Sequence, residues 1–245
     1  MIFVEKTRVR VRHLLPRNVL QVYRKLRSIY RFATRPVHNQ IFARKFIRLV
    51  NNQLSIELGR KNQGIVLDLG ANVGHFSHAA RKMGFRVVAV EPHPEALKHL
   101  SKRFSRDKKV EIIPQAIGNQ TGKTVLNFHP DHSKDRIQTS ISASTISDKF
   151  MGNYESTEIQ QIALDEIFEK YGKFEIVKID IEGGELFLVD ALIRNADNVK
   201  YLLLETHQRF MNFSNLSEEY KSQLMKLEEF IQASGRTEEW TTTWL

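Results

Sequence analysis

Residues 65–77 have the sequence IVLDLGANVGHFS, and this stretch decides the fold of the chain. A short apolar run containing Asp68 is followed by Gly70 and Gly74, and then by a segment that can form a helix, so the order is strand, tight turn, helix. Glycines in such a turn let a ligand approach the backbone, and the amides at the helix N-terminus can bind its polar groups. The stretch therefore predicts a ligand-binding turn in an α/β fold.

The residues around this turn indicate which ligand it binds. Glu91 ends the next apolar run, about 20 residues after Gly70, where α/β nucleotide folds bind the hydroxyls of a ribose. The loop reads G-x-N-x-G instead of the G-x-G-x-x-G of nicotinamide enzymes, and Asp68 stands two residues before it. A carboxylate there suits the positive charges of S-adenosylmethionine but repels a dinucleotide pyrophosphate. The pattern therefore favours S-adenosylmethionine.

Strands and helices alternate along the rest of the chain. We predict strands at 65–69, 86–90, 110–113, 174–179 and 200–204, and helices near 75–83, 94–104, 163–170, 185–193 and 217–233. This alternation predicts a Rossmann-like α/β domain over residues 51–245, with a mainly parallel sheet and helices on both faces. Residues 118–160 are polar, turn-rich and β-branched, and are predicted to form an inserted hairpin or lid.

Composition limits the possible classes of protein. The chain has 245 residues, of which 41% are hydrophobic, enough for one α/β domain with an extension. It contains no cysteine, which excludes disulfides, thiolate metal sites and cysteine nucleophiles. No apolar run approaches membrane-spanning length, and the N-terminus lacks the apolar core of a secretory signal. We therefore expect a cytoplasmic protein, either soluble or peripheral at the membrane.

The basic charge is concentrated at the N-terminus. Residues 1–48 contain 13 Lys or Arg and one acid, Glu5, a net charge of +12. Apolar residues recur at helical spacing between Val19 and Ala33, with arginines between them, so residues 1–50 are predicted to form a basic amphipathic helical extension. Its apolar stripe could dock on the catalytic domain, or the extension could bind an anionic membrane surface or polymer. A mitochondrial presequence is a weaker alternative, because the segment has almost no serine.

Several segments together carry a family resemblance. VLDLGANVGHFS, AVEPHPEALKHL, IPQAIGNQTGKT, IALDEI, VKIDIEGGE and LLLETH resemble, in order and spacing, FkbM-type S-adenosylmethionine-dependent methyltransferases over about residues 60–213. The resemblance implies a class I methyltransferase fold and methylation of a hydroxyl on a sugar, glycan or related natural product. By position, it implies that the methionine end of the cofactor is lined by Asp68, Gly70, Asn72 and Gly74. It further implies that Glu91 binds the ribose hydroxyls and that Gln115 and Ala116 border the adenine.

Two clusters of polar residues could supply the chemistry. Methyl transfer to a hydroxyl is an in-line displacement, so the enzyme must align the acceptor and remove its proton. Asp180 and Glu182 follow the fourth predicted strand, and Glu205 and His207 follow the fifth, at neighbouring ends of the sheet. We predict that His207 is the general base, because its ordinary pKa is close to neutral, and that Glu205 or Asp180 orients it. Nearby Lys178 and Glu185 are interpreted as structural residues.

Other functions stay open. The same carboxylates and imidazole could hold Mg²⁺, which would lower the pKa of the acceptor, although no D-x-D or H-E-x-x-H spacing supports a metal site. A nucleic-acid methyltransferase could use the basic extension to bind phosphates, but the acidic site would repel them and no Asn-Pro-Pro-Tyr-like motif is present. A non-catalytic, cofactor-binding partner subunit is a third possibility, disfavoured because the polar residues at strands four and five are intact.

Overall fold

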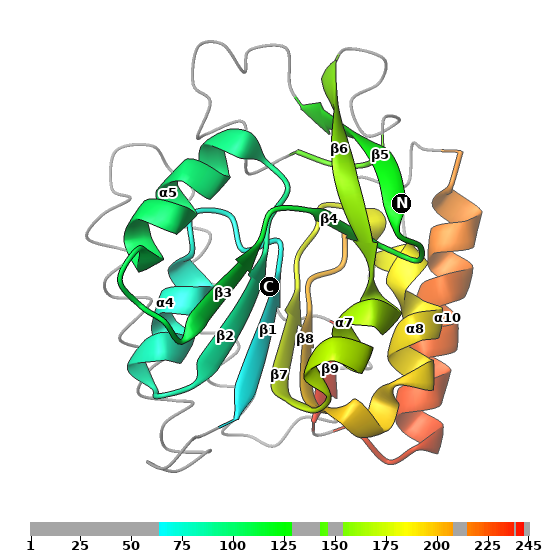
Figure 1. The fold of residues 1–245 in the computed structure, drawn as a ribbon. Helices are drawn as coiled ribbons and strands as arrows, with labels where there is room; N and C mark the ends of the chain where they lie inside the picture. The colour runs from blue at the N-terminus through cyan, green and yellow to red at the C-terminus, as the bar shows by residue number, and fades with distance from the viewer. Residues whose placement is uncertain (1–63, 129–142, 147–153, 208–214, 238, 243–245) are drawn as a thin grey trace, which may run out of the picture.

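The computed structural model describes residues 64–128, 143–146, 154–207, 215–237 and 239–242 (Figure 1). The basic extension predicted over residues 1–50 lies outside the described residues. In the part of the chain that is described, no helix is long and apolar enough to cross a membrane.

A parallel six-stranded sheet forms the centre of the molecule, in the order β3-β2-β1-β7-β8-β9. Its strands are β1 (Ile65–Leu69), β2 (Arg86–Val90), β3 (Val110–Ile113), β7 (Phe174–Ile179), β8 (Val199–Leu204) and β9 (Trp240–Thr241). The first five agree with the predicted strands to within one residue. The strand order turns back between β1 and β7, so the carboxyl ends of these two strands flank the crevice where doubly wound folds bind ligands.

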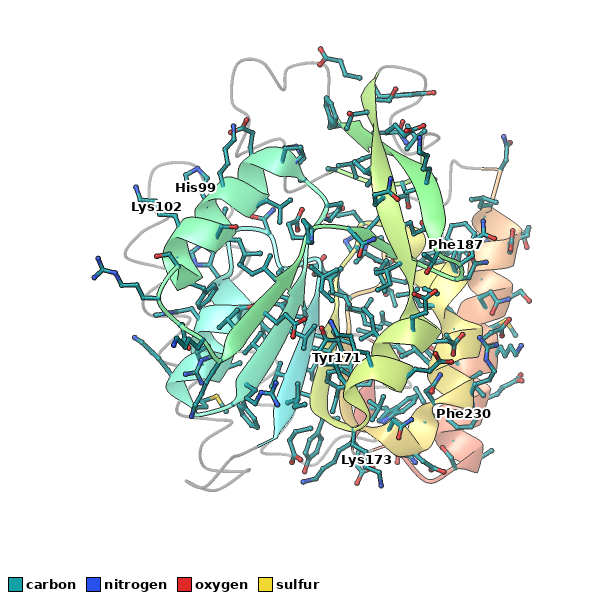
Figure 2. All side chains as sticks on the ribbon, in the orientation of Figure 1. His99, Lys102, Tyr171, Lys173, Phe187 and Phe230 are labelled. Carbon is teal, nitrogen blue, oxygen red and sulfur yellow. The ribbon has the colours of Figure 1, made fainter. Side chains whose placement is uncertain are left out.

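Helices cover both faces of this sheet (Figure 1). One face carries α4 (His75–Lys82) and α5 (Pro94–Phe104), and the other carries α7 (Leu164–Tyr171), α8 (Val189–Arg194) and α10 (Ser217–Ala233). β1 alternates between the two cores: Val66 packs beneath α4 and α5, whereas Leu67 and Leu69 pack on the opposite side. α5 is amphipathic in the same way, with Leu100 buried and with His99 and Lys102 on its outer side (Figure 2).

The helix predicted over 185–193 is divided into two parts. A 3₁₀ helix, η4 (Gly184–Leu188), precedes α8. Two glycines stand at the start of this segment, and the carboxylate of Glu185 accepts hydrogen bonds from the amides of Ile181 and Gly183, at 3.2 Å each. These bonds hold the Glu185 side chain against the turn that precedes it, and the chain forms a 3₁₀ helix there before the α-helix begins.

A second, three-stranded sheet lies beyond the carboxyl edge of the first (Figure 1). It contains β4 (Ala116–Gly118), β5 (Gly122–Phe128) and β6 (Glu155–Ala163) in the order β4-β6-β5, with β5 and β6 antiparallel. Asn127 of β5 also forms an isolated antiparallel bridge with Ser144. Residues 143–146 are thereby attached to the edge of this small sheet.

Gly70 is required by its surroundings as well as by its backbone conformation. It has a φ of +74°, and a Cβ atom there would lie 1.8 Å from the carbonyl oxygen of Asp180. Gly235 has almost the same φ, +72°, but a Cβ there would meet nothing within 4 Å. An alanine substitution at Gly235 therefore has only a conformational cost, whereas one at Gly70 has a steric cost as well.

We expect Gly235→Ala to lower the free energy of unfolding by about 1 to 2 kcal/mol, the cost of a left-handed alanine. Gly70→Ala should cost about 1 to 3 kcal/mol more, because the new methyl group displaces Asp180. Chemical denaturation of both variants, compared with the wild type, measures the difference. Equal destabilisation would show that the contact with Asp180 is relaxed at no cost.

Candidate active site

Four predicted site residues lie side by side along the carboxyl edge of the large sheet. Each continues the hydrogen-bond ladder by donating its amide to a neighbouring strand, at 2.9 to 3.1 Å: Gly70 to Val90, Glu91 to Ile113, Asp180 to Leu69 and Glu205 to Ile179. The register of the parallel strands therefore brings together residues that are up to 135 positions apart in the sequence. The sequence-based expectation that these strand ends form one site agrees with this geometry.

The turn after β1 is built from left-handed residues, with φ values of +74° at Gly70, +49° at Asn72 and +83° at Gly74. The structure gives these glycines a different reason from the one predicted. A Cβ atom at Gly70 would meet the Asp180 backbone, and one at Gly74 would lie 2.6 Å from Leu100. The glycines are thus required by chain conformation and internal packing, and their contact with the cofactor stays a prediction.

Glu91 is held in a fixed orientation at the tip of β2. Its Oε2 accepts a hydrogen bond from the amide of Asn72 and its Oε1 accepts one from the amide of His93, both at 2.8 Å. Burial raises the pKa of Glu91 to about 7, against the opposing effect of these two amides. Each oxygen keeps further lone-pair capacity, so the carboxylate can accept two hydroxyl groups as well. This arrangement fits the ribose of S-adenosylmethionine.

The two residues predicted beside the adenine follow β3. Ala116 begins β4 and is buried, and Gln115 precedes it and is partly exposed. The amide of Glu91 donates a hydrogen bond to the carbonyl of Ile113, and Gln115 and Ala116 follow Ile113 by two and three positions. Their role at the adenine stays a prediction.

Asp68 has no exposed surface and already has internal partners. Its Oδ2 accepts a hydrogen bond from the hydroxyl of Ser77 at 2.6 Å, and its Oδ1 lies 3.4 Å from Nζ of Lys178. The positive charge that the sequence suggested for the ligand is therefore supplied, at least in part, by a lysine of the chain. Contact between Asp68 and the methionine end of the cofactor stays a prediction.

Lys178 joins the glycine turn to the end of β7. Its Nζ donates to the carbonyl oxygens of Leu69 and Gly70, at 3.3 and 2.9 Å, and lies 3.3 Å from Oδ2 of Asp180. Burial alone would lower the pKa of this lysine, but the charges of Asp180 and Asp68 outweigh it and raise the pKa above its ordinary value. The raised pKa keeps the ammonium charged at neutral pH, and these contacts are compatible with the structural role predicted for Lys178.

His207 is oriented by a residue that the sequence analysis treated as structural. Its Nδ1 lies 2.8 Å from Oε1 of Glu185, which is completely buried in η4. The hydroxyl of Tyr220 in α10 donates to Oε2 of Glu185 at 3.0 Å and accepts a hydrogen bond from the amide of His207 at 2.7 Å. Glu185, and not Glu205 or Asp180, therefore fixes the ring. Tyr220 lies in α10, 13 residues after His207, and no motif around it in the sequence predicts this contact.

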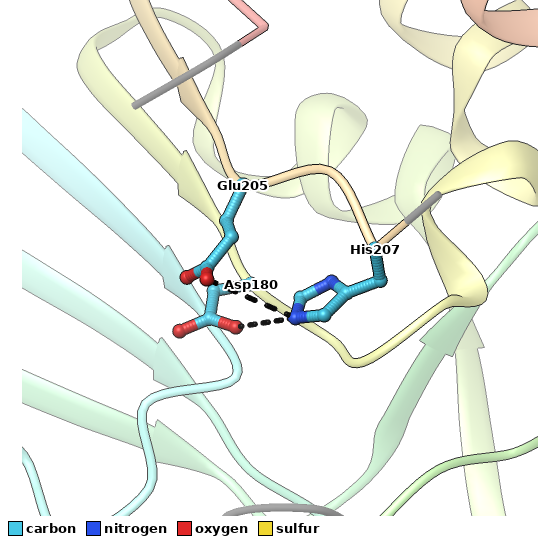
Figure 3. A group of neighbouring side chains, drawn as sticks. All are labelled: Asp180, Glu205 and His207. Carbon is cyan, nitrogen blue, oxygen red and sulfur yellow. Dashed lines mark ion pairs between the residues drawn. The ribbon is translucent and has the colours of Figure 1, made fainter. Parts of the chain in front are cut away.

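The other ring nitrogen faces three carboxylates. Nε2 of His207 lies 3.5 Å from Glu182, 3.7 Å from Asp180 and 4.0 Å from Glu205, the last two of which are drawn in Figure 3. Burial lowers the pKa of an imidazole, but the charges of Glu185 and Glu182 and their hydrogen bonds outweigh it and raise the pKa of His207 well above 6.5. Burial and the charges of Asp180 and Glu182 raise the pKa of Glu205 to about 8.

The same group could also bind a cation. One ligand atom from each of Asp180, Glu205 and His207 lies within 4.8 Å of the others (Figure 3). Carboxylate oxygens and a neutral imidazole are acceptable ligands for a divalent ion. However, Asp180 also faces the ammonium of Lys178, and the pKa of His207 favours its protonated form, which cannot ligate a metal. Both observations weigh against a high-affinity metal site.

Comparison with known proteins identifies the family. The family model of the methyltransferase FkbM domain matches residues 68–235, more than half of the chain. The chain belongs to the FkbM methyltransferase family. Its domain has a Rossmann-like α/β fold, and the family suggested by the sequence motifs is confirmed.

Individual relatives of this FkbM methyltransferase are distant. The hexuronic acid methyltransferase AglP of Haloferax volcanii is 25% identical over 146 residues, which are 58% of this chain and 56% of AglP. The chain thus spans little more than half the length of this relative. Precorrin-6y C5,15-methyltransferase from Geobacter metallireducens is 14% identical, with a TM-score of 0.39 over 78% of this chain and 71% of that one. The SAH-bound methyltransferase PaMTH1 of Podospora anserina is 10% identical, with a TM-score of 0.35 over 87% and 80%.

The environment of Glu91 predicts a pH-dependent affinity for S-adenosylmethionine. Hydroxyl groups bind the charged carboxylate best, so the affinity should be full above pH 7 and should fall as the pH drops below the raised pKa of Glu91, to roughly a tenth at pH 6. At pH 8, Glu91→Ala should weaken binding about ten- to a hundred-fold.

Titration calorimetry at pH 6, 7 and 8 measures both effects. Glu91→Gln is the matched control, because its side chain cannot ionise. Titration of the cofactor's own amino group affects both proteins equally, so the difference between them reports on Glu91. An identical pH dependence in the wild type and in Glu91→Gln, or unchanged affinity in a folded Glu91→Ala, would contradict the assignment.

Proposed function

We propose that this methyltransferase transfers the methyl group of S-adenosylmethionine to a hydroxyl of a sugar, glycan or related natural product, with His207 as the general base. The observation that carries the proposal is the buried pair of His207 and Glu185: Nδ1 of the ring is bound to Glu185, and Nε2 faces the end of β7 beside the glycine turn. The cofactor supplies an electrophilic methyl group when it is bound. The residues of the chain must then bring the acceptor oxygen into line and take its proton.

Each site residue has a role in this scheme. Because the ionised carboxylate of Glu185 accepts from Nδ1, that nitrogen carries a proton, and Nε2 of His207 is the atom that can receive one from the acceptor. Asp180, Glu182 and Glu205 surround Nε2 and stabilise the imidazolium that forms. Their side chains are partly exposed and also offer hydrogen-bond acceptors to the remaining hydroxyls of a sugar. Glu91 holds the cofactor at the opposite side of the turn.

The choice of a sugar acceptor is supported by one relative. AglP, which is similar to this chain over 146 residues, is named as a hexuronic acid methyltransferase, and a hexuronic acid is a sugar. An acidic acceptor site also suits a polyhydroxyl compound better than a polyphosphate, which disfavours a nucleic-acid substrate.

Mass spectrometry of glycans tests the proposal in cells. We expect cells that lack the gene to lose the mass of one methylene from a glycan or related compound, the wild-type gene to restore it, and His207→Ala to fail. Loss of methylation from nucleic acid, with unchanged glycans, would contradict the acceptor class.

With the acceptor so identified, His207→Ala should lower turnover by about 10² to 10⁴-fold while it keeps the affinity for the cofactor. Because the neutral imidazole is the active form, the wild-type rate should rise with pH through a midpoint above 6.5, and the variant should lack this rise. EDTA should have no effect. Inhibition by EDTA that Mg²⁺ reverses would instead favour metal activation by the carboxylates.

We further propose that the basic extension binds an anionic membrane surface, near which lipid-linked acceptors are assembled. The proposal is supported by the net charge of +12 in residues 1–48 and by the apolar stripe between Val19 and Ala33. Each basic residue near an anionic bilayer contributes about 1 kcal/mol before screening by salt.

Liposome co-sedimentation tests this proposal by comparing the full chain with one that starts near residue 50. The full chain should pellet with anionic vesicles and not with neutral ones, and salt should release it. Equal pelleting of the two proteins, or pelleting that does not depend on anionic lipid, would show that the extension is not a membrane anchor.

A further inference from the structure

Glu182 has an unfavourable backbone conformation beside His207. Its φ is +59°, in the left-handed region, and among the described residues Asn72 is the only other non-glycine with a positive φ. Asparagine adopts this region readily, and Asn72 accepts a hydrogen bond from the next amide, that of Val73, through its own side chain. A glutamate adopts this region only at a conformational cost, so contacts with the surroundings of Glu182 must offset that cost.

Ser144 provides a contact that can do so. Its hydroxyl donates a 2.8 Å hydrogen bond to the carbonyl oxygen of Glu182. The same hydroxyl accepts a hydrogen bond from the amide of Ile146 at 3.1 Å, so both its donor and an acceptor position are used. Ser144 is only 1% exposed, which removes water as a competitor for this bond.

Ser144 is itself fixed to the small sheet. Its amide and carbonyl pair with the carbonyl and amide of Asn127 in β5, at 2.9 and 2.7 Å, and the side-chain amide of Asn127 donates to the same carbonyl at 3.3 Å. Asn127 is also buried. A continuous series of buried hydrogen bonds therefore runs from β5 through Ser144 to the carbonyl of Glu182.

The bond from Ser144 to the Glu182 carbonyl also affects where the side chain of Glu182 lies. Its Oε2 lies 3.5 Å from Nε2 of His207, and the next residue, Gly183, donates its amide to Glu185, which orients the same ring. If Glu182 relaxed to a right-handed conformation, its carbonyl and its carboxylate would both turn away. The bond from Ser144 opposes that relaxation.

We propose that Ser144 is a positioning residue, which holds Glu182 in its left-handed conformation and so keeps the Glu182 carboxylate against His207. The small sheet is thereby connected mechanically to the acceptor side of the active site. The catalytic consequence rests on the proposed function, whereas the conformational role of Ser144 does not.

Amide hydrogen exchange measures the conformational role without an acceptor. In Ser144→Ala, the amides of Ile181 and Gly183 should exchange about tenfold faster or more, because the loop loses a buried hydrogen bond. Ser156→Ala is the control, since it removes a hydroxyl from an exposed position of β6 in the same sheet.

Glycine at position 182 gives a second, independent test. Glycine adopts a φ of +59° without cost, so Ser144→Ala combined with Glu182→Gly should recover slow exchange of the loop amides. A residue that acts only by filling space would not be rescued in this way. Unchanged exchange in Ser144→Ala, or no recovery in the double variant, would overturn the proposal.

Turnover on the identified acceptor tests the catalytic consequence. Ser144→Ala should lower kcat about tenfold and leave KM for S-adenosylmethionine unchanged within twofold, and Glu182→Gln should make the enzyme insensitive to the change at Ser144. Additive losses in the double variant would show that Ser144 does not act through Glu182. Full activity of His207→Ala would refute the proposed base, while the exchange results would still decide the role of Ser144.

Discussion

The rest of the site depends on the contacts of the Lys178 ammonium with the carboxylates and carbonyl oxygens at the ends of β1 and β7. Parallel strands that end together bring their last carbonyl oxygens and the following acidic side chains to one edge, and negative potential accumulates there. Lys178 lies within 3.4 Å of the carboxylates of Asp68 and Asp180 and of the carbonyls of Leu69 and Gly70. Removing one member of such a buried group would leave an uncompensated charge, which typically costs about 3 to 5 kcal/mol. The cation allows the glycine turn and the catalytic loop to approach each other closely.

A second level of organisation is built on this neutralised edge. Beyond Lys178, the imidazole of His207 lies within 4.0 Å of the carboxylates of Asp180, Glu182 and Glu205. Its affinity for a proton therefore follows from the number of carboxylates around it. In the proposed reaction the neutral imidazole takes the proton of a bound hydroxyl, and the neighbouring carboxylates stabilise the imidazolium that forms. The same electrostatics make a neutral, hydroxyl-rich acceptor a better partner than a polyanion.

The fold and the strand-end residues could be predicted because their signals are local. Hydrophobic alternation placed the strands of the central sheet, and acidic residues directly after β2, β7 and β8 identified one edge of it. The partners of those residues could not be predicted in the same way. Glu185 was interpreted as structural, and its bond to His207 spans 22 positions of the sequence. Tyr220 and Ser144 reach the site from distant elements through single hydroxyl groups. The packing requirement at Gly70 could not be predicted, because the carbonyl that it accommodates belongs to a residue 110 positions later.

The direct bond between Tyr220 and the amide of His207 has a consequence for how this enzyme can change during evolution. The chain leaves the active site at His207 and returns at Tyr220, and the two points are fastened to each other and to Glu185. The position of the imidazole is therefore insensitive to the composition and length of the connection between them, because lengthening a closed loop adds only a slowly growing entropic cost. Under the proposed function, insertions or substitutions in that connection can therefore change the acceptor preference while the pair of His207 and Glu185 is retained.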